Sequence, residues 1–462
     1  MTGNNRIYQS GLFLLAGYFL LIVAATYWHL ARADDLVSDP KTNAGRLYQE
    51  ELRIERGRIL DRNGVVLADT VRGPDGNSLR RYTEPGLVHV VGYHSARFGD
   101  SGMEAHGTNI LSGMTGASAA IGLFQDLLHL PRKGGDIVLT IDSRIQRVAE
   151  TAMAGRTGAL VAMNPRTGEV LAMVSNPTFE PASLETQWDS LRVSPSRPLL
   201  NRATQGLYIP GSTFKTVTMA AALDARLIEP STAASCREEL DVFGFKVTSH
   251  NEPPGKRTQN MQDALSYSCN TALAELGIKV GRERLTSMAR NLGMLDHVPF
   301  ELDTEAGQMS SAPGFLESPQ GLAVTSFGQG ELLFSPLHLA LATSAIANGG
   351  LVPTPRLVAG SLSVTWRRAM SPQTAFALAS MMEHGVSQGW ASTAAIPGVR
   401  VAGKTGTAEL EAGQQSHAVF IAFAPVDNPR VAIAVIKERA GSGSRESGPV
   451  VKAVLEEALK GE

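Results

Sequence analysis

The sequence predicts an α+β fold in which one antiparallel sheet is covered by helices, preceded by a small module and one membrane-spanning helix. A long uncharged apolar run lies near the N-terminus. The large C-terminal part begins and ends with strand-like apolar segments, and a mainly helical region from about residue 212 to 390 lies between them. Strands at both ends of one unit, with helices between them, favour a single sheet with helices on its faces.

The N-terminal run is expected to anchor the chain in a membrane. From Ile7 to Ala31 there is no Asp, Glu, Lys or Arg, and Tyr27 and Trp28 match an interfacial aromatic belt. A cleaved signal peptide is the alternative, because residues 31–33 resemble an A-x-A cleavage site. The apolar stretch is longer than a usual signal core and ends in bulky aromatic residues, so we expect residues 1–33 to be a short tail and an uncleaved anchor. The flanking charges do not by themselves set its orientation.

The composition excludes several classes of function. The chain has 462 residues and a formal net charge of −2, with no block of Lys and Arg, so no nucleic-acid partner is expected. The ten histidines are scattered, and Cys236 and Cys269 lack the spacing of a zinc site, so we expect no metal and no cofactor. A disulfide between these two cysteines would need a compartment outside the cytoplasm, and the sequence favours leaving them unpaired.

Residues 34–135 are expected to form a small N-terminal module. Asn63-Gly64 is a hairpin turn signal, and "LVHVVGY", residues 87–93, is expected to be a strand. "PRKGGDIVLTIDSRIQ", residues 131–146, is typical of a domain boundary, with a basic turn, a buried strand and a helix that begins near Asp142 or Ser143.

Residues 136–462 are expected to form the α+β unit. "GALVAMNPRTGEVLAMVS", residues 158–175, is typical of a hairpin, and "SPLHLALATSAIANGG", residues 335–350, of a helix that ends at its two glycines. The chain then returns to three strand-like segments, and it closes with an amphipathic helix at residues 448–460.

Three short motifs in this unit combine reactive side chains. "YIPGSTFKTVTMAAAL" places Ser212 and Lys215 three residues apart at the start of a helix, "SYSCNTALAELG" holds Ser268 and Asn270, and "GKTGTAE" holds Lys404–Thr407. Each motif alone has a simpler interpretation, such as a capping serine, a lysine reaching water or a strand edge with a glycine. The order S-x-x-K, S-x-N, K-T-G is the motif set of penicillin-binding proteins and serine β-lactamases.

The chemistry of acyl transfer needs these residue types. Lys215 can take the proton of the Ser212 hydroxyl if burial and a nearby cation lower its pKa. Ser268 can relay a proton to the leaving amine, while Asn270 can hold Lys215 and a substrate amide. Lys404 can supply the cation and attract a substrate carboxylate.

The residues after Lys404 are expected to bind substrate. Thr405 and Thr407 can donate hydrogen bonds to a carboxylate, and Gly406 can let an extended peptide lie along the strand edge. The backbone N–H groups of Ser212 and Thr407 are expected to form an oxyanion hole.

Nearly the whole chain resembles a class B penicillin-binding protein of compact form, a monofunctional peptidoglycan D,D-transpeptidase. The resemblance rests on "RGRILDRNGVVLA", "DIVLTIDSRIQ", "NRATQGLYIPGSTFK", "FGQGELLFSPLHLALATSAIANGG" and "GKTGTAE". It implies a penicillin-binding transpeptidase domain at 136–462 and a non-catalytic pedestal at 34–135. It also implies a single-pass anchor that places the catalytic domain outside the cell membrane.

By the same resemblance, Ser212 is the nucleophile and Lys215 the base, Ser268 and Asn270 form the second motif, and Lys404, Thr405 and Gly406 form the third. The implied partners are peptidoglycan stem peptides, β-lactams and a polytopic membrane glycosyltransferase of the shape, elongation, division and sporulation type. About 100 residues between anchor and catalytic domain leave no room for a polymerase domain of typical size. A secreted β-lactamase would not carry the anchor and the N-terminal module. A D,D-carboxypeptidase and a non-enzymatic β-lactam sensor remain alternatives.

Overall fold

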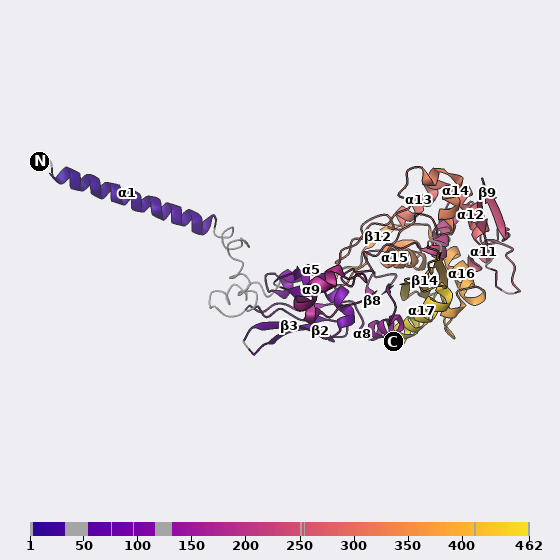
Figure 1. Cartoon of the computed structure of the whole chain (residues 1–462), viewed down its shortest axis with the longest axis horizontal. Helices are drawn as coiled ribbons and strands as arrows, with labels where there is room; N and C mark the ends of the chain where they lie inside the picture. The colour runs from indigo at the N-terminus through magenta and orange to yellow at the C-terminus, as the bar shows by residue number, and fades with distance from the viewer. Residues whose placement is uncertain are drawn as a thin grey trace.

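The computed structural model describes residues 3–32, 54–74, 76–95, 97–115, 132–249, 252–253, 255–410 and 413–460 (Figure 1). The helices are α1 (Gly3–Leu30), α4 (Val88–Val91), α5 (Gly102–His106), α6 (Thr108–Leu111), α8 (Ser143–Met153), α9 (Leu184–Val193), α10 (Lys215–Asp224), α11 (Met261–Ser266), α12 (Asn270–Val280), α13 (Arg282–Asn291), α14 (Pro319–Ser326), α15 (Pro336–Ala347), α16 (Pro372–Gln388) and α17 (Gly443–Leu459). Short 3-10 helices are η1 (Pro85–Leu87), η2 (Pro181–Ser183), η3 (Gly211–Phe214), η4 (Phe315–Glu317) and η5 (Ser392–Ala394).

The strands are β1 (Ile59–Leu60), β2 (Val66–Arg72), β3 (Ser78–Tyr82), β4 (His94–Ser95), β5 (Gly99–Asp100), β6 (Ile137–Val138), β7 (Gly158–Met163), β8 (Val170–Asn176), β9 (Glu239–Val242), β10 (Phe245–Thr248), β11 (Leu351–Pro353), β12 (Thr365–Arg368), β13 (Ala402–Ala408), β14 (His417–Ala424) and β15 (Val431–Lys437).

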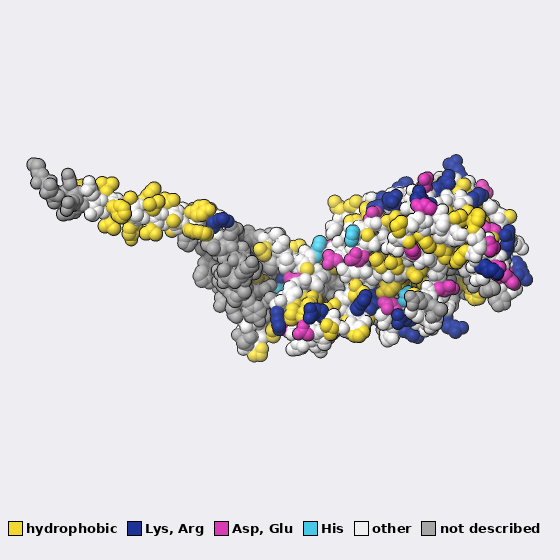
Figure 2. Space-filling model, turned by 45° about the horizontal axis from the view of Figure 1, so that its top comes forward, with side chains coloured by type: hydrophobic (Ala, Val, Ile, Leu, Met, Phe, Trp, Pro, Cys, Tyr) yellow, Lys and Arg dark blue, Asp and Glu magenta, His cyan; other side chains and the backbone are white. Residues whose placement is uncertain are grey.

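Helix α1 is long and apolar enough to cross a membrane. Its span Tyr8–Trp28 has 21 residues, none of them buried against the rest of the protein. Figure 1 shows α1 apart from the folded body, and Figure 2 shows hydrophobic side chains along its surface. An apolar helix of this length that is not buried against the described part of the chain fits a bilayer anchor.

The N-terminal module is built on a four-stranded sheet in the order β3-β2-β1-β6. Strands β1 and β2 are antiparallel across the expected turn, where Gly64 has φ +82°. Strand β6 pairs in parallel with β1, so the last strand of this sheet lies just beyond the boundary expected at residue 135. The sheet of this module therefore takes its last strand from residues after 135.

The strand expected at residues 87–93 is wrong. The segment instead forms η1 and the single turn α4, which ends at Gly92 with φ +84°. Pro85 at the start of η1 favours a helical turn, and all four residues of α4 are buried, so a short apolar run cannot distinguish a buried turn from a strand here.

The C-terminal unit contains an antiparallel sheet, as the sequence predicts, and this sheet has five strands in the order β13-β14-β15-β7-β8. The chain enters the sheet through the hairpin β7–β8 and returns to it after the helical region through β13, β14 and β15. Strand β13, which carries the K-T-G motif, is therefore an edge strand of this sheet.

Alternate residues of the sheet face two different cores. In β15, Val431, Ile433 and Val435 pack with α8 and α17 on one face, while Ala432 and Ile436 pack on the other face with the large core that includes α15. Helix α8 begins at Ser143 with Asp142 as its N-cap, as expected. The helices between β8 and β13 extend beyond the sheet and carry the first two motifs (Figure 1).

A small apolar cluster and several polar contacts join the two modules. Val88 of α4 packs with Phe179 and with Leu184 of α9. Asn201 donates a hydrogen bond to the backbone oxygen of His89 at 3.1 Å. The main core is also continuous from the N-terminal sheet into the C-terminal unit, which fixes the orientation of one module on the other.

Candidate active site

The expected nucleophile and base lie on consecutive turns of one buried segment. Ser212 is on η3, and Lys215 is the first residue of α10. A Cβ atom at Gly211, which has φ +57°, would lie 2.8 Å from the carbonyl of Thr407, so glycine lets the two backbones approach. Lys215 is 0% exposed, so the simpler interpretation, in which this lysine reaches water, is wrong.

The second motif is a tight turn between two helices. Helix α11 ends at Ser266, and Ser268 has φ +61°, a left-handed conformation that non-glycine residues rarely adopt. Cys269 is the N-cap of α12, because its Sγ accepts a hydrogen bond from the backbone N–H of Ala272 at 3.4 Å. Asn270 then begins the helix, so the simpler expectation that Ser268 or Asn270 serves only as a cap does not hold.

The third motif lies on the edge strand β13. Lys404 and Thr405 are buried, whereas Thr407 is exposed. An edge strand has unpaired backbone groups on its free side, which is the geometry needed to accept an extended peptide as an additional strand. The motif thus combines a buried cation with a free strand edge.

The fold brings the three motifs together around the Ser268 hydroxyl. The Nζ atom of Lys215 donates to Ser268 Oγ at 3.0 Å, to Ser268 O at 2.6 Å and to Asn270 Oδ1 at 2.7 Å. Lys404 Nζ approaches the same hydroxyl from the other side, also at 3.0 Å, and donates to Thr405 O at 2.8 Å. Ser268 therefore bridges two lysines from different motifs.

Burial lowers the pKa of both lysines. Desolvation holds the pKa of Lys215 well below its ordinary value, and the charge of Lys404 lowers that pKa further, while the Glu409 carboxylate raises it. Desolvation also lowers the pKa of Lys404 to about 7. A lysine with a lowered pKa can be neutral near physiological pH and act as a proton acceptor.

A cavity of about 290 Å³ opens over these motifs. Its lining residues are Ser212, Ser268, Asn270, Gln329, Trp390, Thr405, Thr407, Glu409, Ser442 and Ser444. Sequence reasoning missed Gln329, Trp390, Glu409, Ser442 and Ser444 as site residues. Gln329 and Glu409 do lie in segments that carry the family resemblance, but Ser442 and Ser444 precede and begin α17 with no local signal. Within the described ranges, no group of three or more His, Cys, Asp or Glu side chains could hold a metal ion.

Gly406 also has a packing role that the sequence does not indicate. A Cβ atom there would lie 2.8 Å from the backbone oxygen of Pro210, 3.0 Å from Thr213 Cγ2 and 3.1 Å from Val419 Cβ. A side chain at this position would therefore collide with the turn that carries Ser212. Glycine is required because β13 packs tightly on η3.

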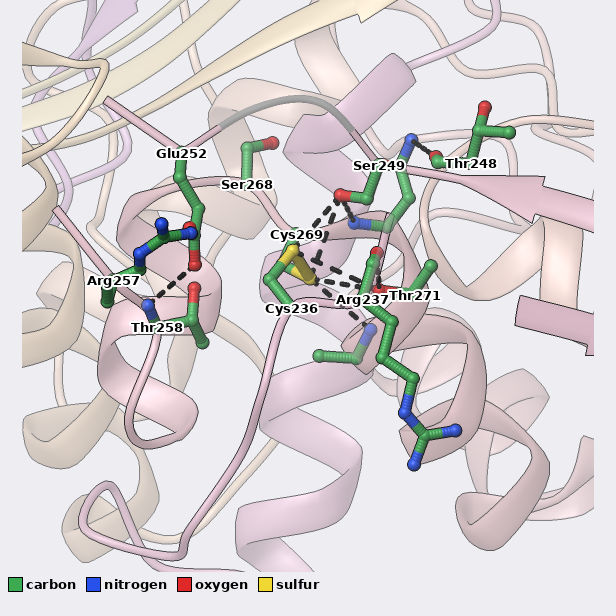
Figure 3. The surroundings of a disulfide bond; sticks show 12 residues. Cys236, Arg237, Thr248, Ser249, Glu252, Arg257, Thr258, Ser268, Cys269 and Thr271 are labelled. Carbon is green, nitrogen blue, oxygen red and sulfur yellow. Dashed lines mark hydrogen bonds and ion pairs between the residues drawn. A yellow bond between two sulfur atoms is a disulfide. The ribbon is translucent and has the colours of Figure 1, made fainter. Parts of the chain in front are cut away.

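The two cysteines, expected to be unpaired, form a disulfide. Figure 3 shows the bond between the segment before β9 and the start of α12, with Ser268 directly before Cys269. Cys236 and Cys269 are 33 residues apart, and no local pattern marks their approach, because only the tertiary fold brings them together.

Comparisons with known proteins cover both modules. A family model described as "Penicillin binding protein transpeptidase domain" matches residues 158–456. A second, described as "Penicillin binding protein A dimerisation domain", matches residues 56–137. The chain is also 34% identical to the peptidoglycan D,D-transpeptidase PbpA of Mycobacterium tuberculosis, over 99% of this chain and 100% of that protein.

Solved structures show the same fold. The ceftriaxone acyl-enzyme complex of penicillin-binding protein A from M. tuberculosis superimposes with a TM-score of 0.82 at 32% identity, over 89% of this chain and 100% of that chain. Pseudomonas aeruginosa PBP2 in complex with WCK 5153 gives a TM-score of 0.76 at 31% identity, over 88% and 96% of the two chains. These matches, together with the three motifs assembled in one site, establish that the chain belongs to the class B penicillin-binding proteins.

Proposed function

We propose that this chain is a peptidoglycan D,D-transpeptidase in which Ser212 forms the acyl-enzyme. The observation that carries the proposal is the Ser268 hydroxyl, which lies 3.0 Å from the Nζ atoms of both Lys215 and Lys404 beside the cavity that Ser212 lines. Relatives over the full length are named peptidoglycan D,D-transpeptidases, and related structures are β-lactam acyl-enzymes.

The proposed acylation begins with neutral Lys215. It accepts the proton of the Ser212 hydroxyl as Oγ attacks the carbonyl of the penultimate D-Ala residue. The backbone N–H groups of Ser212 and Thr407 stabilise the oxyanion. Ser268, held by both lysines, passes the proton to the departing D-Ala amine. Lys404, Thr405 and Thr407 bind the terminal carboxylate.

The acyl-enzyme is resolved by the amine of a second stem peptide, which forms the cross-link. Its attack places the peptide carbonyl on the new amide and returns a proton to Ser212 Oγ. Penicillins and other β-lactams acylate the same serine. A D,D-carboxypeptidase would transfer the acyl group to water instead, and a sensor would not transfer it at all.

The test is covalent labelling with a fluorescent penicillin, followed by mass spectrometry of the labelled peptide. We expect the label on Ser212 and its loss in Ser212→Ala, with Ser190→Ala, at an exposed position on α9, as the folded control. Stoichiometric labelling of Ser212→Ala would refute the assignment. With stem peptides, a cross-linked dimer supports transpeptidation, whereas a shortened monomer alone supports the carboxypeptidase alternative.

We also propose that α1 anchors the protein with its catalytic module outside the cytoplasm. The Cys236–Cys269 disulfide supports this orientation, because disulfides persist in oxidising compartments. Alkaline phosphatase fused after residue 460 should be active in cells. An inactive fusion that is instead protected from external protease would reverse the orientation.

A polytopic glycosyltransferase is the proposed membrane partner, because a cross-linking enzyme needs glycan strands. The proposed contacts are the segment Gly11–Ala31, which α1 forms up to Leu30, and the module segment Arg56–Ala68, whose exposed turn includes Val65. Replacing residues 7–31 by an unrelated membrane helix, or Val65 by Arg, should weaken co-purification with that enzyme and lower glycan polymerisation. Penicillin acylation of Ser212 should stay unchanged. Full polymerisation with both changes would leave α1 as a simple tether.

A further inference from the structure

The turn at Ser268, between α11 and α12, needs contacts with other segments to keep its conformation. Ser268 has φ +61°, which a residue with a Cβ atom adopts only when surrounding contacts enforce it. The same turn must place the Ser268 hydroxyl within 3.0 Å of two lysines that lie on different elements. What holds the turn therefore controls the geometry of proton transfer.

The disulfide is attached to the residue next to Ser268. Cys269 is fully buried, follows Ser268 directly and caps α12. Its partner Cys236 lies before the hairpin of β9 and β10 (Figure 3). A covalent bond therefore fixes one end of the turn to a segment that belongs to neither α11 nor α12.

Hydroxyl groups surround the disulfide and connect it to the second motif. Ser249, directly after β10, has its Oγ 3.2 Å from Cys236 Sγ, and it accepts a hydrogen bond from the backbone N–H of Asn270 at 3.1 Å. Thr271 Oγ1 lies 3.3 Å from Cys269 Sγ and donates to the backbone oxygen of Arg237 at 3.0 Å. The segments on both sides of the β9–β10 hairpin therefore contact the second motif.

Asn270 has one support of its own that does not involve sulfur. Its side-chain amide donates to the backbone oxygen of Thr248 at 3.1 Å, whereas its backbone N–H is bound by Ser249, whose Oγ also contacts Cys236 Sγ. Ser268, between α11 and α12, receives hydrogen bonds on its hydroxyl from Lys215 and Lys404. Loss of the disulfide should therefore affect Ser268 more than Asn270.

We propose that the Cys236–Cys269 disulfide is a positioning element for acylation, which acts by holding Ser268 between Lys215 and Lys404. The proposal rests on the acylation of Ser212 proposed above. Misplacing a catalytic group by about 1 Å can cost on the order of a hundredfold in rate, so loss of the bond should slow acylation by about tenfold or more. The enzyme then reaches full activity only in an oxidising compartment.

The bond can be removed in two independent ways. Cys236→Ala breaks it and leaves Cys269 Sγ as the cap of α12. In wild type, tris(2-carboxyethyl)phosphine transfers two electrons to the disulfide, which takes up two protons to give two thiols, while the phosphine becomes its oxide with oxygen from water. Alkylation and mass measurement then count the free thiols. The second-order acylation rate constant for penicillin is measured in detergent, well below the thermal midpoint of each form.

We expect both treatments to slow acylation by about tenfold or more. The reductant should not change the acylation rate of Cys236→Ala, which has no disulfide to reduce. Glu275→Ala is the matched control, because it removes the exposed ion pair from Glu275 to Arg237 at 3.1 Å and leaves the sulfur atoms in place. Its acylation should equal that of wild type.

A double-mutant cycle separates positioning from general stability. If the disulfide acts through Ser268, Cys236→Ala should slow Ser268→Ala by less than about twofold, whereas a purely structural effect would multiply the two losses. The same full loss in both backgrounds, or reduced wild type acylating at the oxidised rate, would overturn the proposal. Failure of oxidised wild type to acylate at all would instead refute the proposed function.

Discussion

At the scale of single residues, the lowered pKa of Lys404 predicts how the acylation rate depends on pH. The proposed acylation needs Lys215 without its proton and Lys404 with its proton. Burial and the charge of Lys404 hold the pKa of Lys215 well below its ordinary value, and burial lowers that of Lys404 to about 7. The acylation rate should therefore rise with pH as Lys215 becomes neutral and fall above about pH 7 as Lys404 loses its charge. A bell-shaped profile of the second-order acylation rate constant for penicillin is the expected result.

Substitutions at Lys404 test whether this lysine causes the fall in acylation rate at high pH. Lys404→Arg keeps its charge throughout, so it should retain some activity and shift the alkaline limb upward. Lys404→Ala should slow acylation by about a hundredfold or more at every pH, because it removes the anchor for a carboxylate. An alkaline limb unchanged in Lys404→Arg would assign that limb to another group.

At the scale of elements, the contact between β13 and η3 decides how close the third motif comes to Ser212. Gly406→Ala would place a Cβ atom 2.8 Å from the backbone oxygen of Pro210, and a backbone atom cannot move as a flexible side chain can. We expect a loss of about 1–3 kcal/mol in unfolding free energy and a slower acylation, since β13 must shift away from η3.

Gly403→Ala on the same strand is the matched control for this prediction. A Cβ atom at Gly403 would meet side-chain atoms of Phe420 and Val386 at 3.0 and 3.2 Å, on the opposite face of β13 from Ser212. It should lower stability while the folded protein acylates nearly as wild type. Equal acylation rates for the two variants would mean that the spacing of β13 from η3 does not matter.

At the scale of the whole molecule, the N-terminal module depends on a buried charge network. Glu104 is fully buried and lies 2.9 Å from Arg56 and 2.6 Å from Arg80, whose side chains are 6% and 5% exposed. Removing one partner leaves buried charges uncompensated, which typically costs about 3–5 kcal/mol. Glu104→Gln should therefore lower the unfolding free energy of the full chain by that amount.

Thermal and denaturant unfolding of the full chain in detergent would measure this loss. Asp69→Asn is the control, because it removes the surface partner of Arg81 in the same sheet and should cost less than about 1 kcal/mol. Equal losses for the two variants would contradict a special role for the buried network. Because one core runs through both modules, the loss should lower the stability of both.

Features that depend on a local residue pattern can be predicted from the amino-acid sequence alone. Periodicity, turn residues and length predict the strands of the main sheet, the helix α15 that is followed by two glycines, and the apolar span α1. The three motifs were recognisable because each is a short run in a fixed order. Other features depend on how distant segments pack in the folded chain. Whether Lys215 is buried, whether Cys236 meets Cys269 and which face Gly406 turns to η3 depend on residues distant in the chain, because desolvation and close packing are properties of the assembled core.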